Sequence, residues 1–171
     1  GVAVQQDGTL TINNNNNPLF QNIFSGDFEN YRIIMDLVGF SGGILALRLS
    51  QDGTDEATNN YMWGGYRSVA GGNQLTSWDK SPWSEWQVGV LDADPIRKSP
   101  AIIDILSPYT SGRATKAHWD NFGYQSSVGN VAFTGTGLLA TSNSYNSLRV
   151  YTSGSLNNLT GTVRVYGYNG A

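Results

Sequence analysis

Turn-forming residues recur roughly every ten positions along this chain, and this spacing limits the choice of fold more than any other feature. Residues that favour helices are scarce between the turns, and apolar and polar side chains alternate there as they do in strands. Residues 31–38 are the clearest case, because Tyr31, Ile33 and Leu37 share one face and Arg32 and Asp36 the other. Both faces are partly apolar, so we predict a central strand.

Short strands of this kind follow one another along the chain. Residues 101–107 lie between two prolines that leave room for at most about two helical turns, so we expect a buried strand with Ile103 and Ile105 inward. The whole pattern predicts an all-β fold, a jelly-roll-like antiparallel β-sandwich of about ten strands in a single domain. Other strands are expected at residues 45–50, 61–69, 83–91 and 113–125, and around Val131, Leu148 and Val163.

Two segments break the strand pattern. Residues 13–17 are five consecutive asparagines closed by Pro18, and we expect a surface loop or a crossing between subunits there, since such a run cannot fill a core. The predicted domain organisation is therefore an N-terminal arm at residues 1–17 and the sandwich at 18–171. Residues 75–82 are expected to form an irregular loop.

Composition narrows the class of protein. The length of 171 residues fits one domain, and 12% aromatic residues with 13% charged residues exclude a disordered chain. A net charge of −3 with scattered lysines and arginines argues against nucleic acid or an anionic membrane surface as a partner. Cysteine is absent, which excludes disulfides and thiolate metal sites.

Catalytic patterns are weak. His118 is the single histidine and no Gly-x-Ser-x-Gly motif occurs, so we expect His118 to be a structural or surface residue. A glycosidase needs two carboxylates about 5–10 Å apart. Asp92 with Asp94, or Asp79 with Glu85, allow such a pair, but a solvated turn is the simpler interpretation of residues 92–94. We predict that the chain is not an enzyme and has no cofactor and no catalytic residue.

Metal ligands are equally sparse. The oxygens of residues 52–56 could hold Ca²⁺, but this segment lacks the EF-hand pattern with glycine at its sixth position. A histidine-based site would need further nitrogen ligands. A polar hairpin loop is the better interpretation of residues 52–56, and no metal site is predicted.

Aromatic residues give the strongest candidate binding site. Four of the five tryptophans lie between residues 63 and 86. Flat apolar rings with polar edges suit the faces of sugars, and tryptophan and tyrosine are frequent at contact hot spots. The alternative is that most of these rings fill the core or a subunit interface, and burial is the stronger expectation for Trp86. The candidate ligand-binding residues are Trp63, Tyr66, Trp78 and Trp83.

Several motifs in a fixed order give the chain a family resemblance. They are FQNIFS at residues 20–25, NYRI at 30–33, LRLS at 47–50 followed by DGT at 52–54, IDILSPY at 103–109, SLRVY at 147–151 and LTGTVRVYGY at 159–168. In this order they resemble a β-sandwich domain of tailed-bacteriophage virion proteins, found on tail fibres, spikes and capsid-surface appendages. Together the motifs span residues 20–168, nearly the whole chain, although residues 71–82 match no pattern of that family.

The resemblance implies a structural protein at the virion surface, assembled as a homotrimer and in contact with other virion proteins. It transfers no catalytic residue. The function that we expect is host attachment, with a tail-fibre or spike domain contacting a host-surface glycan. Two alternatives stay open: a capsid decoration or head-fibre protein, and a carbohydrate-binding module.

Overall fold

A computed structural model describes residues 2–4, 9–39, 43–69, 72–94, 96–125, 129–153 and 158–169. Within these ranges the chain forms strands and no helix, which confirms the all-β prediction. The strands are β1 (Val2–Val4), β2 (Thr9–Asn15), β3 (Leu19–Phe20), β4 (Asn30–Gly39), β5 (Gly43–Gln51), β6 (Thr54–Asp55), β7 (Tyr61–Val69), β8 (Gly72–Trp83), β9 (Trp86–Leu91), β10 (Ser99–Leu106), β11 (Thr115–Gln125), β12 (Gly129–Leu139), β13 (Ser147–Ser153) and β14 (Leu159–Tyr168).

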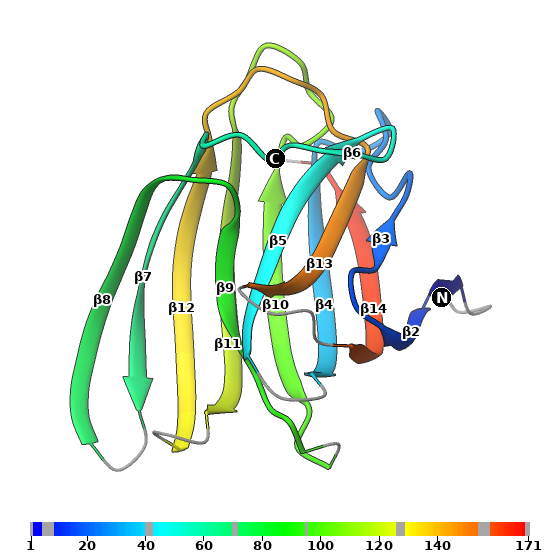
Figure 1. Cartoon of the computed structure of the whole chain (residues 1–171). Coiled ribbons are helices and arrows are strands. Elements are labelled where there is room, and N and C mark those ends of the chain that lie inside the picture. Colours follow the sequence, from blue (N-terminus) through cyan, green and yellow to red (C-terminus); the bar gives the residue numbers. More distant parts are fainter. Residues whose placement is uncertain are drawn as a thin grey trace.

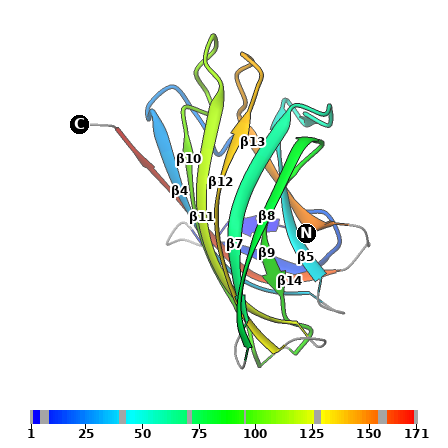
Figure 2. The same cartoon turned by 90° about the vertical axis from the view of Figure 1, so that its left-hand side faces the viewer.

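The strands form two antiparallel sheets that pack face to face (Figures 1 and 2). The larger sheet has nine strands in the order β1-β2-β14-β4-β10-β11-β12-β7-β8, and the smaller has the order β3-β13-β5-β6 with β9 also paired to β5. The chain passes from β2 in the larger sheet to β3 in the smaller, back to β4, and across again to β5. This alternation between layers confirms the predicted sandwich.

β4 is a central strand, as the sequence predicts, because β14 pairs along one side of it and β10 along the other. Ile103 of β10 lies opposite Ile33, and both are completely buried. The inward positions predicted for Ile103 and Ile105 are confirmed, since both are completely buried. Also buried are one face of β4 and the leucines of β5, namely Tyr31, Ile33, Met35, Leu37, Leu45, Leu47 and Leu49. The core therefore lies between the sheets, where alternate residues of each strand meet.

Two buried indoles pack directly against the backbone of β12. Trp119 of β11 and Trp86 of β9 are completely buried, which confirms the burial expected for Trp86. Residues 135 and 137 of β12, on the same inner face, are glycines. A Cβ atom on Gly135 would lie 2.8 Å from the Trp119 ring, and one on Gly137 would lie 2.5 Å from Trp86 Nε1. The two rings therefore occupy the volume that side chains of β12 would otherwise fill.

The structure corrects the prediction for residues 13–17. Asn13, Asn14 and Asn15 end strand β2, which lies between β1 and β14 in the larger sheet. Ile12 is completely buried, and Asn13 and Asn14 are exposed. Pairing with β14, near the other end of the chain, holds this polar segment in the sheet, so the sandwich includes residues from the predicted arm.

The predicted irregular loop at residues 75–82 is also wrong. These residues lie in β8, which pairs with β7 through a register that has two irregularities. Trp83 ends β8 and does not begin the strand that contains Trp86. The ladder of backbone hydrogen bonds to β7 overrides the weak strand propensity of the polar residues here.

The contact between β12 and the indoles predicts a large effect of one added methyl group. We expect Gly137→Ala to lower the free energy of unfolding by about 1–3 kcal/mol, because the Trp86 ring must shift within a packed core. Urea denaturation measures this change. Gly26→Ala is the matched control, since its Cβ would meet only Tyr109 at 3.7 Å, an ordinary contact. Equal stability of the two variants would contradict the packing argument.

Candidate functional site

The larger sheet has one face against the smaller sheet and its other face open to solvent (Figure 2). Along β11 buried and exposed residues alternate, with Trp119 and Asn121 inward and His118, Asp120 and Phe122 outward. The open face gathers most of the large apolar and aromatic side chains that are exposed among the described residues. These are Met62, Tyr66, Ile102, Leu106, Phe122, Tyr166 and Tyr168.

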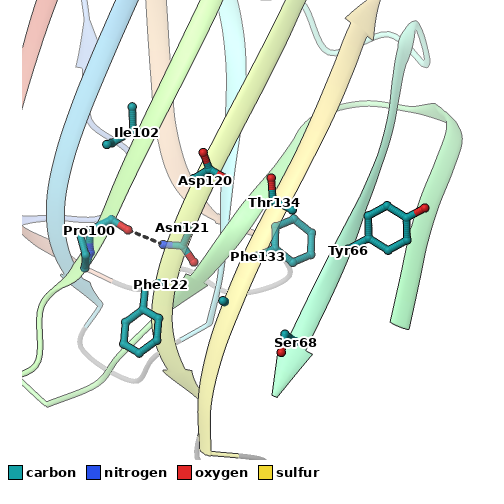
Figure 3. Close-up of a pocket in the computed structure, with 10 residues that line it drawn as sticks. Tyr66, Ser68, Pro100, Ile102, Asp120, Asn121, Phe122, Phe133 and Thr134 are labelled. Carbon is teal, nitrogen blue, oxygen red and sulfur yellow. Dashed lines mark hydrogen bonds between the residues drawn. The ribbon is translucent and has the colours of Figure 1, made fainter. Parts of the chain in front are cut away.

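A first depression of about 350 Å³ lies on this face across β10, β11, β12 and β7 (Figure 3). The rings of Tyr66 and Phe122 stand on its two sides, 55% and 51% exposed. Between them β12 contributes only small outward side chains, Ala132 opposite Phe122 and Thr134 opposite Tyr66. The depression exists because small residues on the middle strand lie between large ones on its neighbours.

The strands behind this depression are tied together by Asn121. Its Oδ1 accepts a hydrogen bond of 2.8 Å from the Val90 backbone N–H, and its Nδ2 donates one of 3.1 Å to the Pro100 carbonyl (Figure 3 shows the second). One side chain thus joins β9 of the smaller sheet to β10 and β11 of the larger. Asp120 and Phe122 are the sequence neighbours of Asn121. The backbone from which they project is therefore fixed to β9 and β10 through the Asn121 side chain.

A second depression of about 580 Å³ lies further along the same strands. Its outward residues include Met62, Leu106, Lys116, Thr136 and Leu138. Together the two depressions follow the outward side of β12, and we call them the trough: the outward side chains of Ala132, Thr134, Thr136 and Leu138 with the residues of β7, β10 and β11 beside them.

Polar side chains line the trough, and few of them make contacts with other polar groups of the described residues. The hydroxyls of Tyr66, Ser68, Thr134 and Thr136 have no hydrogen-bond partner among the described residues. The Asp120 carboxylate has one polar neighbour there, His118, with Nε2 at 3.7 Å from Oδ2. Within the described part of the chain, these groups keep donors and acceptors that a ligand can use.

The neighbouring carboxylate is engaged. Asp104 accepts two hydrogen bonds of 2.8 Å from the Arg32 guanidinium on the same open face. The hydrogen bond from Arg32 and its positive charge hold the pKa of Asp104 below its usual value, despite partial burial. Asp104 therefore stays ionised and paired next to the trough.

The four aromatic residues proposed from the sequence as ligand-binding residues do not lie together in the structure. Tyr66 lies in the trough with an exposed ring. Trp63 is 4% exposed and packs edge-on against Phe133 at 6.4 Å between ring centroids, so it is a core residue that only borders the second depression. Trp83 is 37% exposed, but it lies opposite the buried Tyr61, on the inner side of the sheet. Trp78 lies in β8 opposite Gly65, and its side chain falls outside the described residues.

Phe122 and Asp120 line the trough but were not predicted as site residues from the sequence. Both lie in a segment whose alternation is strict, so they could have been assigned to the face opposite Trp119. They can contact a ligand only because the smaller sheet leaves that face uncovered. The alternation of the sequence does not show which face is covered. His118 is exposed on this face, which confirms the surface alternative predicted for it.

Glu85, one of the carboxylates considered for catalysis, is 4% exposed and fully engaged. Its carboxylate accepts hydrogen bonds from the Tyr151 and Ser153 hydroxyls and one of 3.2 Å from Gln87 Nε2, and Arg48 lies 3.7 Å away. Burial alone would raise the pKa of Glu85, but these hydrogen bonds and the charge of Arg48 outweigh it and the pKa is lowered. An ionised carboxylate with this many donors serves structure.

The other acidic segments serve the fold as well. Asp92 is buried, which corrects the solvated turn expected at residues 92–94, and its Oδ1 accepts a 2.9 Å hydrogen bond from the Asp94 N–H. The side chain of Asp79 lies outside the described residues. Asp55, in the predicted hairpin loop, accepts a 2.6 Å hydrogen bond from Arg149. In the described ranges no three acidic or histidine side chains gather as metal ligands would, and no helix there could span a membrane.

Comparison with known proteins finds no counterpart: no protein-family model, no curated protein and no solved structure matches this chain.

The Glu85 cluster predicts a pH-dependent contribution to stability. Because the pKa of Glu85 is lower in the folded state than in the unfolded chain, its contribution is complete above the unfolded value of about 4.3 and is lost as the pH falls through the folded value. We expect Glu85→Gln to destabilise the protein by about 1–3 kcal/mol at pH 7. The difference from wild type should shrink toward pH 3, as measured by urea unfolding at each pH.

Asp120→Asn is the control for this prediction. The Asp120 side chain is 65% exposed and has only a distant histidine beside it, so its substitution should leave stability nearly unchanged at both pH values. A cost of Glu85→Gln that stays constant from pH 7 to pH 3 would contradict the assignment of an ionised, stabilising carboxylate.

Proposed function

We propose that this chain is a non-enzymatic attachment domain at the surface of a tailed-phage virion and that it contacts a host-surface glycan through the trough. One observation carries the glycan contact: the exposed rings of Tyr66 and Phe122 border a row of small residues beside the Asp120 carboxylate and hydroxyls that have no partner among the described residues. The virion setting and the trimeric state rest on the order of sequence motifs described above.

The chemistry of the trough suits a sugar. The C–H faces of a pyranose ring pack on aromatic rings such as those of Tyr66 and Phe122. A carboxylate accepts hydrogen bonds from two neighbouring sugar hydroxyls, as Asp120 could, and the hydroxyls of Thr134 and Thr136 donate or accept. These groups stand on a sheet held by Asn121, so little conformational freedom is lost on binding.

The carboxylates support binding without hydrolysis. Acid-assisted cleavage of a glycoside requires a protonated carboxyl group with a raised pKa and a second carboxylate at a fixed distance. Asp104 lies on the same face, but its pairing with Arg32 lowers its pKa and keeps it ionised. Among the described side chains, Asp120 therefore has no partner suited to act as the acid.

The sheet edges support assembly into an oligomer. β8 is an edge strand of twelve residues that pairs with β7 alone among the described strands, and β1 ends the other side of the sheet. Long unpaired edges invite pairing with other chains, and proteins commonly cover them. A homotrimer, as the family resemblance implies, provides such cover.

The alternative of a capsid decoration protein has an observation of its own. Ile102 and Leu106 on the open face are branched aliphatic side chains, 45% and 37% exposed, and Met62 on the same face is 38% exposed. Exposed aliphatic groups of this kind are typical of surfaces that contact protein. In this alternative the trough would be covered by another virion protein.

Substitution of the trough aromatics tests the proposal. We expect Phe122→Ala and Tyr66→Ala each to weaken binding to the best ligand on an array of bacterial surface polysaccharides at least tenfold, or about 1.4 kcal/mol, because each removes a stacking surface. Tyr166→Ala is the matched control: its ring is 50% exposed on the same face, on β14, away from the trough. Unchanged binding by both trough variants would rule out the trough as the glycan site.

The mass in solution tests the assembly. We expect light scattering to give a species of about three times 18.5 kDa for the wild type and for Phe122→Ala alike, because the trough faces ligand and not another subunit. A trimer that Phe122→Ala converts to monomers would instead make the open face a subunit interface. Binding to capsid shells that Phe122→Ala abolishes would favour the decoration alternative.

A further inference from the structure

We infer that the trough takes an extended, neutral oligosaccharide of about four sugar units, laid along β12 across both depressions. This inference rests on the proposed glycan contact and specifies the shape and charge of the ligand. It depends on three features of the described residues: the length of the row of outward side chains on β12, the different chemistry of its two ends, and the opening at Gly64.

The length comes from the strand geometry. The outward side chains of Ala132, Thr134, Thr136 and Leu138 all lie on one side of β12. Six residue steps at roughly 3.3 Å each span about 20 Å, which is close to the length of four pyranose units in an extended chain. A single sugar would occupy only one of the two depressions.

The two depressions are placed end to end. In the first, one row across the sheet runs from Asp120 through Thr134 to Tyr66. In the next, the row runs from His118 through Thr136 to Gly64. Gly64 has no side chain, so nothing on β7 stands beside Thr136 as Tyr66 stands beside Thr134. The ligand can therefore pass from the first depression into the second.

The charges select a neutral chain. The first depression has the Asp120 carboxylate and the second has the Lys116 ammonium. A chain with a negative charge on every unit would meet Asp120 unfavourably, and a chain with a positive charge on every unit would meet Lys116 unfavourably. A neutral chain instead accepts hydrogen bonds from Lys116 at one end and donates them to Asp120 at the other.

Both depressions are open on the solvent side. Tyr66 and Phe122 are half exposed although they form the sides of the first depression, so the trough contacts a ligand along one surface and does not enclose it. Affinity at an open surface grows with the number of units in contact. A ligand that extends along the strand gains this contact, whereas a compact one does not.

Oligosaccharide ladders test the inference. The probes are neutral ladders of one to six β-1,4-linked glucose, mannose or galactose units, each titrated into the wild-type protein by calorimetry. We expect the best-binding ladder to gain at least tenfold in affinity from two to four units and less than twofold from four to six. A sulfated ladder of the same sugar should bind at least tenfold more weakly than the neutral one.

Two variants locate the units. Lys116→Ala in the second depression should weaken binding of the four-unit ligand about threefold and leave the two-unit ligand unchanged. Thr136 is exposed and lies opposite Gly64, so Thr136→Arg should reduce the four-unit affinity to that of the two-unit ligand because the arginine side chain fills the passage beside Gly64. Tyr166→Ala is the control and should behave as wild type with every length.

The outcomes separate this inference from the proposed function. A ladder whose affinity is constant from two units onward, and falls with Phe122→Ala, would keep the glycan site but overturn the extended ligand. Tighter binding of the sulfated ladder would overturn the neutral ligand. Failure of the wild type to bind any ladder or any polysaccharide of the array would overturn the proposed function together with the inference.

Discussion

The structure depends on the close approach of two tryptophan rings to one strand. Trp119 and Trp86 lie against the backbone of β12, where Gly135 and Gly137 leave no side chain in their way. Trp86 also packs edge-on against Tyr61, with ring centroids 5.3 Å apart, and the Tyr61 hydroxyl accepts a 2.9 Å hydrogen bond from the Leu49 N–H. These contacts join β12, β11 and β7 of the larger sheet to β9 and β5 of the smaller one.

The same strand shapes both of its faces. β12 alternates glycine toward the core with threonine toward solvent over residues 134–137, and Ala132 continues the small outward set. Inside, the missing side chains make room for indoles; outside, the small ones leave a depression between Tyr66 and Phe122. The floor of the trough thus lies directly behind the packed indoles of Trp119 and Trp86, which give the exposed rings a rigid base.

Much of the fold could be predicted because local alternation determines which side chains share a face. Ile103 was assigned to the core on that basis, and it lies there opposite Ile33. β2 was missed because its polar residues are held by β14, at the far end of the chain, and such a pairing leaves no local signal. Trp63 was predicted to bind a ligand because tryptophan is common both in binding sites and in cores. Its place in the core follows from its contact with Phe133 on the next strand, which the sequence does not show. Phe122 escaped notice because alternation does not say which face stays uncovered.

Because inward and outward residues alternate strictly, the residues that stabilise the fold differ from those that could contact a ligand, and the two sets can change independently. On β11, each inward residue such as Trp119 or Asn121 is followed by an outward one that the core does not touch. Substitution of an exposed side chain away from caps and pairs changes stability by only about 0.5 kcal/mol in either direction. Positions 120, 122, 134 and 66 can therefore change one at a time while the sandwich keeps its packing. A lineage that must follow a changing host surface could alter its specificity by single substitutions on this face, without first acquiring stabilising mutations elsewhere.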